Sequence, residues 1–322
     1  SFDFVGNEKN FKASSFQPSQ DRPFVEQMVK YLDSDHHFLE CTTEAQAELL
    51  KDSVLAPALP AMADVDSSML YFCSQVHSFC KVALTGECAD EIFGGYPWFH
   101  REECFLAHTF PWTMDLKARQ VLLDDEFLSE LGMEAYVKQT YEASLAQTPI
   151  LQGESPMESR RREISYLNLR WFMQTLLNRM DRSSMYNGLE ARVPFADHRI
   201  IEYLWNVPWE MKTKDGVVKN LLRQSGRGKL PEEILFRRKS PYPKTYDTGY
   251  EKLLSEKVQE ILSDSSAPVL RFLDKQKVQK FLSSPSDYGK PWYGQLMAAP
   301  QMMAYIIQID FWLKHYKPEI II

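Results

Sequence analysis

Residues 82–96 read Val-Ala-Leu-Thr-Gly-Glu-Cys-Ala-Asp-Glu-Ile-Phe-Gly-Gly-Tyr. The apolar run Val82–Leu84 predicts a short buried strand, because both faces of a parallel strand are normally covered by helices. Thr85 and Gly86 then break the strand, and the acidic residues that follow are typical of the first turn of a helix. The stretch therefore predicts a strand, a tight turn and a charged helix start, as in an α/β protein.

Two interpretations of this turn are open. Ligands of open parallel sheets bind beyond the carboxyl ends of the strands, where Gly86 would let the backbone approach a phosphate. Glu87 and Asp90 would then hold the metal ion of that phosphate through their carboxylates. Alternatively, Thr85, Asp90 and Glu91 only cap the helix and complement its dipole.

The composition of the chain narrows the class of protein. Its 322 residues suffice for about two domains of ordinary size, and the net charge of -7 argues against a general nucleic-acid binder, which needs a basic surface. No apolar run reaches membrane-spanning length, and the first residues lack the features of a signal peptide. The five cysteines form no Cys-x-x-Cys pair, which favours reduced thiols in a cytoplasmic protein.

The N-terminal part predicts two strands separated by a helix. Residues 1–6 predict a strand that has already begun, so we expect a further segment ahead of Ser1. Residues 24–32 predict an amphipathic helix, and residues 36–40 predict the second strand. This strand begins with two histidines, whose side chains would point to opposite faces. They are therefore better suited to packing and hydrogen bonding than to a shared metal ion.

The loop 62–68 precedes a predicted helix that ends near Val76. Asp66 or Ser67 is the expected N-cap of this helix, and a contribution of the loop to a substrate pocket is the alternative. Beyond residue 96 the pattern is mainly helical, with five core candidates: Trp112, Leu116, Leu122, Phe127 and Tyr136. We therefore expect an α/β part over residues 1–96 and a largely helical part over residues 97–322.

A second informative stretch spans residues 169–195. Apolar residues recur here at steps of three and four, which predicts one buried face of a long helix that ends near Gly188. Asp181 directly follows this face, and a carboxylate so close to a buried stripe is costly unless it is paired or binds a cation. A cation site and a structural ion pair with Arg182 or Arg192 are the two interpretations.

A basic tract occupies residues 219–244. Most of its lysines and arginines are expected to form a solvated face. Lys239 differs because the segment 237–243 contains two prolines, which favours a rigid loop able to hold one ammonium group in place. Such a group is suited to balance the charge of a phosphate or of a tetrahedral transition state.

Three motifs occur in a fixed order along the chain. They are Thr-Gly-Glu-Cys-Ala-Asp-Glu-Ile-Phe-Gly-Gly-Tyr at 85–96, Asn-Arg-Met-Asp-Arg-Ser-Ser-Met through Glu-Ala-Arg-Val-Pro-Phe-Ala-Asp at 178–197, and Gly-Val-Val-Lys-Asn-Leu-Leu-Arg at 216–223 with Arg-Arg-Lys at 237–239. Together they resemble the synthetase domain of glutamine-hydrolysing asparagine synthetases. Cys88 departs from the family pattern because it stands where that pattern has a glycine, at a point where a glycine-only backbone conformation is expected. Ala196 replaces a leucine, which is a packing change.

The resemblance implies an asparagine-synthetase-type domain over residues 1–322, with a partial parallel sheet of the PP-loop ATP pyrophosphatase (adenine nucleotide alpha-hydrolase-like) type. In that family ATP adenylates the side-chain carboxylate of aspartate and releases pyrophosphate, and ammonia then attacks the acyl-adenylate to give asparagine and AMP. The resemblance assigns Glu87 and Lys239 to catalysis, Asp90 and Asp181 to Mg²⁺ and nucleotide, and three further residues to ATP: Phe4, Thr85 and Gly86.

Two features of the family do not occur in this sequence. The pyrophosphate-binding loop Ser-Gly-Gly-x-Asp-Ser is one, and the N-terminal glutaminase domain, which supplies ammonia from glutamine, is the other. We therefore expect a fragment that binds ATP weakly by itself, with aspartate and ammonia as substrates and a homodimer as a possible assembly. Amide formation on another carboxylate, as in β-lactam or peptide amidation, and a non-catalytic homologue are alternatives, whereas an RNA-modifying relative is disfavoured by the acidic balance.

Overall fold

The strands in the described part of the chain form two parallel pairs. A computed structural model describes residues 1–13, 17–287 and 298–321. In the first pair, β1 (Phe2–Phe4) lies beside β2 (Leu39–Cys41), with Phe4 opposite Cys41. In the second, β3 (Val82–Leu84) lies beside β4 (Glu190–Arg192), with Leu84 opposite Arg192. The expected first strand is confirmed, whereas the second begins three residues later than predicted.

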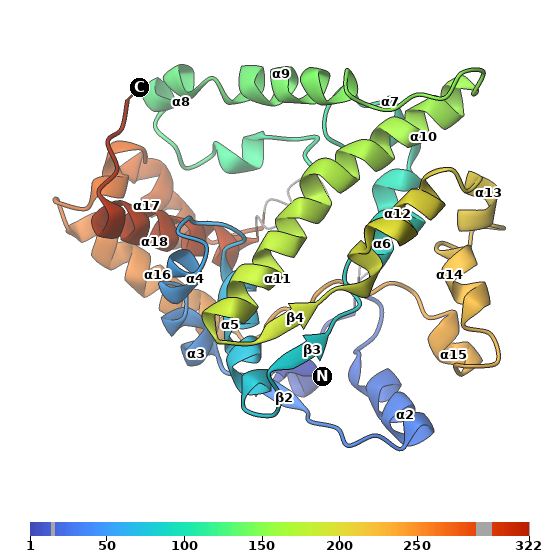
Figure 1. The fold of residues 1–322 in the computed structure, drawn as a ribbon. Helices are drawn as coiled ribbons and strands as arrows, with labels where there is room; N and C mark the ends of the chain where they lie inside the picture. The colour runs from blue at the N-terminus through green and yellow to red at the C-terminus, as the bar shows by residue number, and fades with distance from the viewer. Residues whose placement is uncertain (14–16, 288–297, 322) are drawn as a thin grey trace.

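Helices make up most of the described chain (Figure 1). The N-terminal helices are α1 (Asn7–Asn10), α2 (Arg22–Leu32), α3 (Thr43–Glu48), α4 (Asp52–Leu55), α5 (Asp64–His77) and α6 (Ala89–Phe93). The middle helices are α7 (Glu102–Leu106), α8 (Asp125–Leu131), α9 (Met133–Leu145), α10 (Pro156–Leu167), α11 (Gln174–Tyr186) and α12 (His198–Trp205). The C-terminal helices are α13 (Trp209–Lys212), α14 (Asn220–Ser225), α15 (Glu232–Leu235), α16 (Thr248–Ser263), α17 (Lys275–Ser283) and α18 (Ala299–Tyr316).

One long helical rod crosses the molecule (Figure 1). It consists of α10, a π-helical segment over Asn168–Met173, and α11, which packs against α5. Asn187 ends α11, and Gly188 follows in the left-handed region with φ +73°. The predicted long helix and its end are thereby confirmed, and the chain leaves this end directly into β4.

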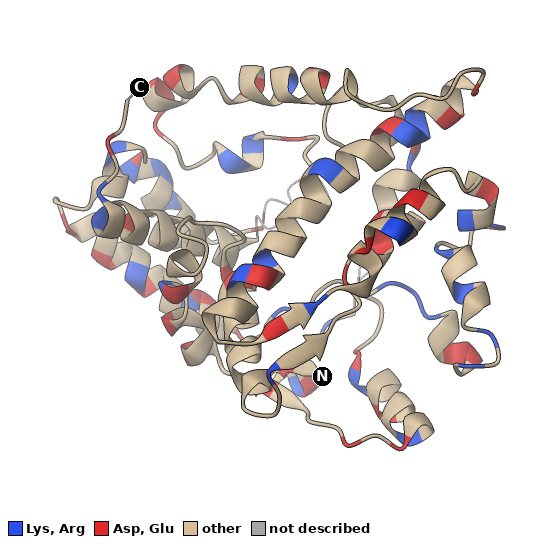
Figure 2. Ribbon diagram, in the orientation of Figure 1, with Lys and Arg blue, Asp and Glu red and all other residues tan. Residues whose placement is uncertain are grey.

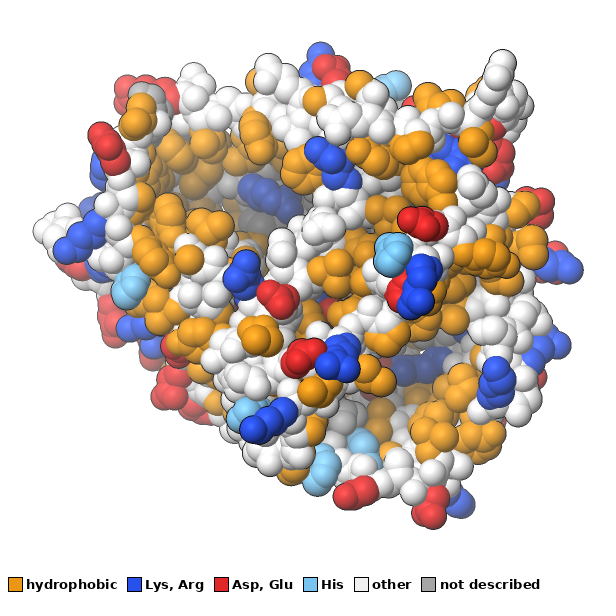
Figure 3. All heavy atoms as spheres, in the orientation of Figure 1, with side chains coloured by type: hydrophobic (Ala, Val, Ile, Leu, Met, Phe, Trp, Pro, Cys, Tyr) orange, Lys and Arg blue, Asp and Glu red, His pale blue; other side chains and the backbone are white. Residues whose placement is uncertain are grey.

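The prediction that Val82–Leu84 is fully buried was wrong. Val82 and Leu84 are 42% and 74% exposed, whereas Ala83 between them packs toward Met69, Cys73 and Leu189. Because side chains alternate along a strand, only one face of β3 meets the core in the described chain. Exposed apolar side chains are visible on this side of the molecule (Figure 3).

The start of α5 also differs from the expectation. The helix begins at Asp64, and Ala63 precedes it in an unusual conformation with φ +50°. Asp66 therefore lies inside the first turn, where its Oδ2 accepts a hydrogen bond from the backbone N–H of Met62 at 2.8 Å. Ser67 is fully buried and donates to the carbonyl of Asp64 at 3.0 Å. The cap thus differs from the predicted one because Asp66 bonds backwards, to the loop before the helix.

The two histidines before β2 make local contacts. His36 Nε2 lies 3.0 Å from the hydroxyl of Ser1, and the ring of His37 stacks on Phe79 with 3.9 Å between centroids. The expectation of packing and hydrogen bonding at this strand entry is confirmed. These contacts tie β2 to the first residue of the described chain and to the turn after α5.

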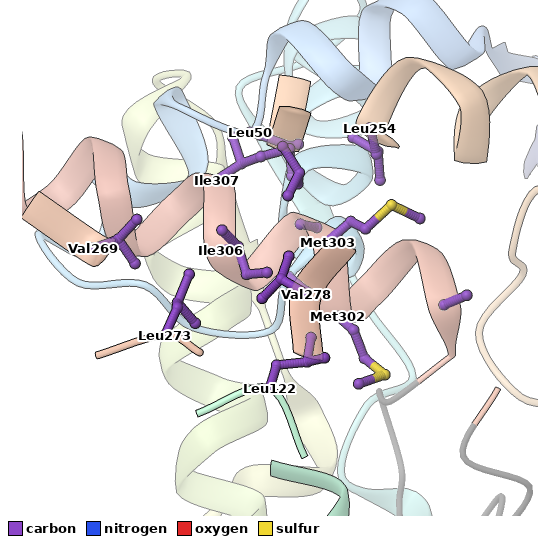
Figure 4. Close-up of a cluster of buried hydrophobic side chains, with 14 of the residues drawn as sticks. Leu50, Leu122, Leu254, Val269, Leu273, Val278, Met302, Met303, Ile306 and Ile307 are labelled. Atoms are coloured by element: carbon purple, nitrogen blue, oxygen red, sulfur yellow. The ribbon is translucent and has the colours of Figure 1, made fainter. Parts of the chain in front are cut away.

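The largest hydrophobic core lies among the C-terminal helices (Figure 4). It joins α16, α17 and α18 to Leu50 and Leu122, which lie far away in sequence. Of the five core candidates, Leu122 belongs to this cluster, but Tyr136 is 67% exposed. Tyr136 lies on α9, whose sequence pattern does not distinguish its buried side from its exposed side. In the described ranges no helix is both long and apolar enough to span a membrane.

Candidate functional site

The turn between β3 and α6 contains the first group of predicted site residues. The hydroxyl oxygen of Thr85 accepts a hydrogen bond from the backbone N–H of Glu87 at 3.3 Å. Gly86 is exposed, and a Cβ placed on it would meet no atom within 4 Å. Cys88 has φ +70°, in the left-handed region that favours glycine. The turn therefore leaves open space at Gly86 and is strained at Cys88.

Glu87 is held by an arginine from α11. Its Oε1 accepts a hydrogen bond from Arg179 Nη2 at 2.6 Å, and both side chains are largely buried. Arg179 also lies 3.6 Å from the sulfur of Met62 and 5.8 Å from the centroid of the Tyr242 ring. Within the described residues Glu87 Oε2 is buried without a hydrogen-bond partner. One carboxylate oxygen is thus fixed, and the other remains able to accept a hydrogen bond.

Asp90 binds two lysines from a distant part of the chain. Lys219 Nζ lies 2.8 Å from Asp90 Oδ1, and Lys239 Nζ lies 2.7 Å from Asp90 Oδ2. Burial acts to raise the pKa of Asp90, but the Lys239 and Lys219 ammonium groups outweigh it and lower that pKa below its ordinary value. Because one carboxylate neutralises only one of two ammonium groups, the trio carries a net positive charge.

Two glycines allow this trio to form. A Cβ at Gly95 would lie 1.9 Å from Asp90 Oδ1 and 3.0 Å from Lys219 Cδ, so a side chain there would displace the ion pairs. Gly94 has φ +70° and ends α6 in the left-handed region. The Gly-Gly step therefore gives the lysines room to reach Asp90.

Lys239 also contacts an aromatic ring next to this site. Its ammonium lies 4.8 Å from the centroid of the Tyr96 ring, within the range of a cation–π interaction. The Tyr96 hydroxyl donates to Glu91 Oε1 at 2.7 Å, and burial raises the pKa of Glu91. The side chain of Lys239 is thus oriented by a carboxylate and by a ring.

Asp181 lies apart from Asp90 and Glu87. Its side chain is 63% exposed and pairs weakly with Arg182 at 3.9 Å. Arg179, which does reach Glu87, is two residues earlier in α11, so their side chains project about 200° apart around the helix. The predicted ion pair with Arg182 is therefore present, and the structure does not bring Asp90 and Asp181 together.

The predicted magnesium site does not fit this arrangement. Both oxygens of Asp90 are engaged by ammonium groups, and Asp181 points to solvent. In the part of the chain that the structure describes, no group of three His, Cys, Asp or Glu side chains could hold a metal ion. A shared Mg²⁺ at Asp90 and Asp181 therefore stays a prediction.

Phe4 is the last residue of β1 and lies in the hydrophobic core. Its ring is 1% exposed and meets Phe72 edge to face, with 6.1 Å between centroids. Because the whole residue is buried, the backbone contact with ATP that the family resemblance implies for Phe4 stays a prediction.

The sequence motifs alone do not indicate the roles of two residues of the site, Arg179 and Lys219. Arg179 begins the Arg-Met-Asp-Arg motif, and Lys219 lies in the Gly-x-x-Lys-x-x-Leu-Arg motif. Both motifs are visible in the sequence, but which of their cations faces a carboxylate depends on the tertiary fold. Arg223 lies in α14, and further Lys and Arg residues follow in the segment after α15 (Figure 2), so composition alone does not single out Lys219.

These features define the protein as a helix-rich α/β protein with a positively charged site beyond the carboxyl end of a parallel strand. A family model described as asparagine synthase matches residues 8–314, so the chain belongs to the asparagine synthase family. The chain is 44% identical to asparagine synthetase [glutamine-hydrolyzing] 3 of Bacillus subtilis (strain 168) over 321 residues, which are 99% of this chain and 52% of that protein.

Other relatives match a smaller part of the chain. Asparagine synthetase [glutamine-hydrolyzing] 1 of the same strain is 29% identical over 237 residues, which cover 63% of this chain and 37% of that protein. The human asparagine synthetase [glutamine-hydrolyzing] is 33% identical over 127 residues, which cover 38% of this chain and 23% of that protein. The chain thus spans about half the length, or less, of these curated relatives.

Proposed function

We propose that the protein carrying this chain is an ATP-dependent ligase that makes asparagine. In the first step an oxygen of the aspartate side-chain carboxylate attacks the α-phosphorus of ATP, and the bond to the β-phosphate breaks to release pyrophosphate. In the second step ammonia attacks the activated acyl carbon, and the carbon–oxygen bond to AMP breaks. The similarity of the chain to two glutamine-hydrolysing asparagine synthetases of Bacillus subtilis supports this proposal.

The observation that carries the proposal is the pairing of Asp90 with Lys219 and Lys239. Adenylation places negative charge on the departing pyrophosphate, and fixed ammonium groups stabilise such charge without reorganising. The site lies beyond the carboxyl end of β3, where parallel sheets bind ligands. We infer that the two lysines contact phosphate oxygens and that Asp90 keeps them in place between turnovers.

Glu87 has the geometry of a group that receives a proton. Arg179 binds one of its oxygens, and the other has no partner among the described residues. The ammonium formed when ammonia attacks the acyl carbon must lose a proton, and a carboxylate within hydrogen-bond reach is able to take it. We assign this step to Glu87, which also orients the attacking nitrogen.

Several parts of the proposal rest on the family resemblance. We propose the PP-loop ATP pyrophosphatase type of fold, with Phe4, Thr85 and Gly86 on the nucleotide and the division at residue 96. Glutamine as the nitrogen source, a homodimer, Mg²⁺ as the companion of ATP and a cytoplasmic location are proposed on the same ground. When bound, Mg²⁺ would neutralise phosphate charge.

Exchange of labelled pyrophosphate into ATP tests the proposal in the complete gene product. We expect exchange that requires aspartate and falls at least about 100-fold in the Lys239→Ala and Asp90→Ala variants, because the anion site is lost. Lys229→Ala is a matched control, since it removes an exposed lysine of the same basic tract. Exchange supported by another carboxylate but not by aspartate would overturn the substrate assignment, and no exchange with any carboxylate would overturn the reaction.

A further inference from the structure

Arg223 joins the two segments that carry the site's lysines. From α14 its guanidinium donates to three backbone carbonyls: through Nε to Val218 at 2.8 Å, through Nη2 to Arg237 at 3.1 Å, and through Nη1 to Leu235. Val218 directly precedes Lys219, and the other two carbonyls lie four and two residues before Lys239. One side chain thus bonds the backbone beside both lysines.

The bond to Val218 acts at a strained point of the backbone. Lys219 has φ +56° and ψ +32°, a left-handed conformation that is costly for a residue with a Cβ. The backbone N–H of Arg223 donates to the Lys219 carbonyl at 2.9 Å, while its side chain binds the Val218 carbonyl. Arg223 therefore holds both peptide groups that flank Lys219, and such strain persists only where its surroundings fix it.

The segment that leads to Lys239 needs the same support. Residues 236–241 form neither helix nor strand. The side chain of Arg237 anchors this segment on one side, through Asp21, through the Ser240 hydroxyl at 3.0 Å and through the Phe24 ring at 4.1 Å. Arg223 anchors it on the other side, through backbone carbonyls.

We propose that Arg223 is a positioning residue that sets the spacing of Lys219 and Lys239 for binding of the phosphate chain. The inference rests on the proposed function, because it takes the two lysines as ligands of phosphate oxygens. The planar guanidinium supplies several donors in a fixed fork, and the single ammonium of a lysine does not reproduce that geometry. Arg223 contributes geometry, while Lys219 and Lys239 contribute the charge that meets the ligand.

Calorimetric titration of the complete gene product with inorganic pyrophosphate measures this role directly. We expect Arg223→Ala to weaken pyrophosphate binding about 10- to 100-fold and to raise the KM for ATP, because small displacements of such groups have large effects. Arg223→Lys restores the charge and should not restore the affinity. Arg227→Ala is the matched control, since this substitution removes the same charge from a neighbouring residue. The guanidinium of Arg227 lies 5.7 Å from the centroid of the Phe236 ring.

A double-mutant cycle separates positioning from a general effect on stability. If Arg223 acts through Lys239, Arg223→Ala should weaken pyrophosphate binding by less than about threefold when Lys239 is already alanine. The effects of two substitutions are not additive when the residues share one function. Thermal unfolding identifies any variant that fails to fold, and Arg223→Lys then takes its place in the cycle. Equal effects in both backgrounds, or unchanged pyrophosphate affinity, would overturn the inference.

The same experiments keep the two proposals apart. If the wild type binds pyrophosphate but shows no aspartate-dependent exchange, the proposed reaction is contradicted. The double-mutant cycle on pyrophosphate binding then still tests the role of Arg223. Intact exchange with full pyrophosphate affinity in the Arg223→Ala and Arg223→Lys variants contradicts the role of Arg223 alone.

Discussion

Cys88 shows how a single residue stores strain beside the site. It adopts φ +70°, although its Cβ makes that region costly by about 1–2 kcal/mol. Its thiol is nevertheless buried against Ile92, Phe93 and Leu204, so packing offsets part of the cost. The departure from the family glycine was visible in the sequence, and the structure gives its physical consequence.

Because Cys88 is strained, we expect a glycine variant at this position to be more stable than an alanine variant, the reverse of the usual order. Cys88→Ala removes the thiol and keeps the Cβ, whereas Cys88→Gly removes both. We expect the glycine variant to unfold with a free energy about 1 kcal/mol higher than that of the alanine variant, although glycine normally destabilises a folded backbone. Urea denaturation of both variants measures the difference. An alanine variant that is the more stable of the two would contradict the assigned strain.

Asp64 predicts a pH dependence of stability. Burial raises the pKa of Asp64 to about 7, and the negative charge of Asp66 acts in the same direction. A hydrogen bond with Gln301 and the positive charge of Lys244 lower this pKa, but burial outweighs them. Between pH 4 and pH 7 the folded state therefore binds more protons at this site than the unfolded state does. Its contribution to stability is fully present below the unfolded pKa and is lost as the pH rises through about 7.

Replacing Asp64 by Asn should remove this loss. We expect Asp64→Asn to raise the free energy of unfolding at pH 8 by about 2 kcal/mol and to leave it nearly unchanged at pH 4. Denaturant titrations at the two pH values measure the effect, with Asp35→Asn as the control because that aspartate is exposed. A variant that loses stability at pH 8 would show that the charged carboxylate is favourable where it lies.

The Gly94-Gly95 step at the end of α6 leaves the space in which Asp90 pairs with Lys219 and Lys239. We expect Gly95→Ala to lower the free energy of unfolding by about 1–3 kcal/mol, because its Cβ would overlap Asp90 and crowd Lys219. Gly86→Ala is the matched control for stability, since its Cβ would enter open space. Equal stability of the two variants, measured by thermal unfolding, would mean that the Asp90 pairs rearrange without cost.

Near the site, the sequence patterns predicted which helices and strands form more reliably than they predicted which faces are buried. The strand at Val82–Leu84, the turn after it and the acidic start of α6 all follow from local residue types. The exposed face of β3 did not follow, because an apolar strand has the same pattern whether one face is covered or both are. The start of α5 was missed because Asp66 bonds backwards to Met62, which spacing does not reveal.

Segments far apart in the sequence meet at the β3–β4 sheet and the site beside it. β4 comes from residues that follow α11, yet it pairs with β3, and both lysines of the site come from beyond residue 216. The sequence singled out Glu87, Asp90 and Lys239 as candidates from their motifs. It could not show that Lys219 completes the trio or that Asp181 faces solvent, because both facts depend on tertiary packing.

The fate of one oxygen atom distinguishes adenylation of aspartate from other ways of activating its carboxylate. Aspartate labelled with ¹⁸O in its side-chain carboxylate is supplied to the complete gene product with ATP and ammonia, and the AMP is analysed by mass spectrometry. Because the carboxylate oxygen attacks phosphorus and stays there when nitrogen displaces AMP, we expect one ¹⁸O atom in each AMP formed. Unlabelled AMP, or ADP and phosphate in place of AMP and pyrophosphate, would contradict it.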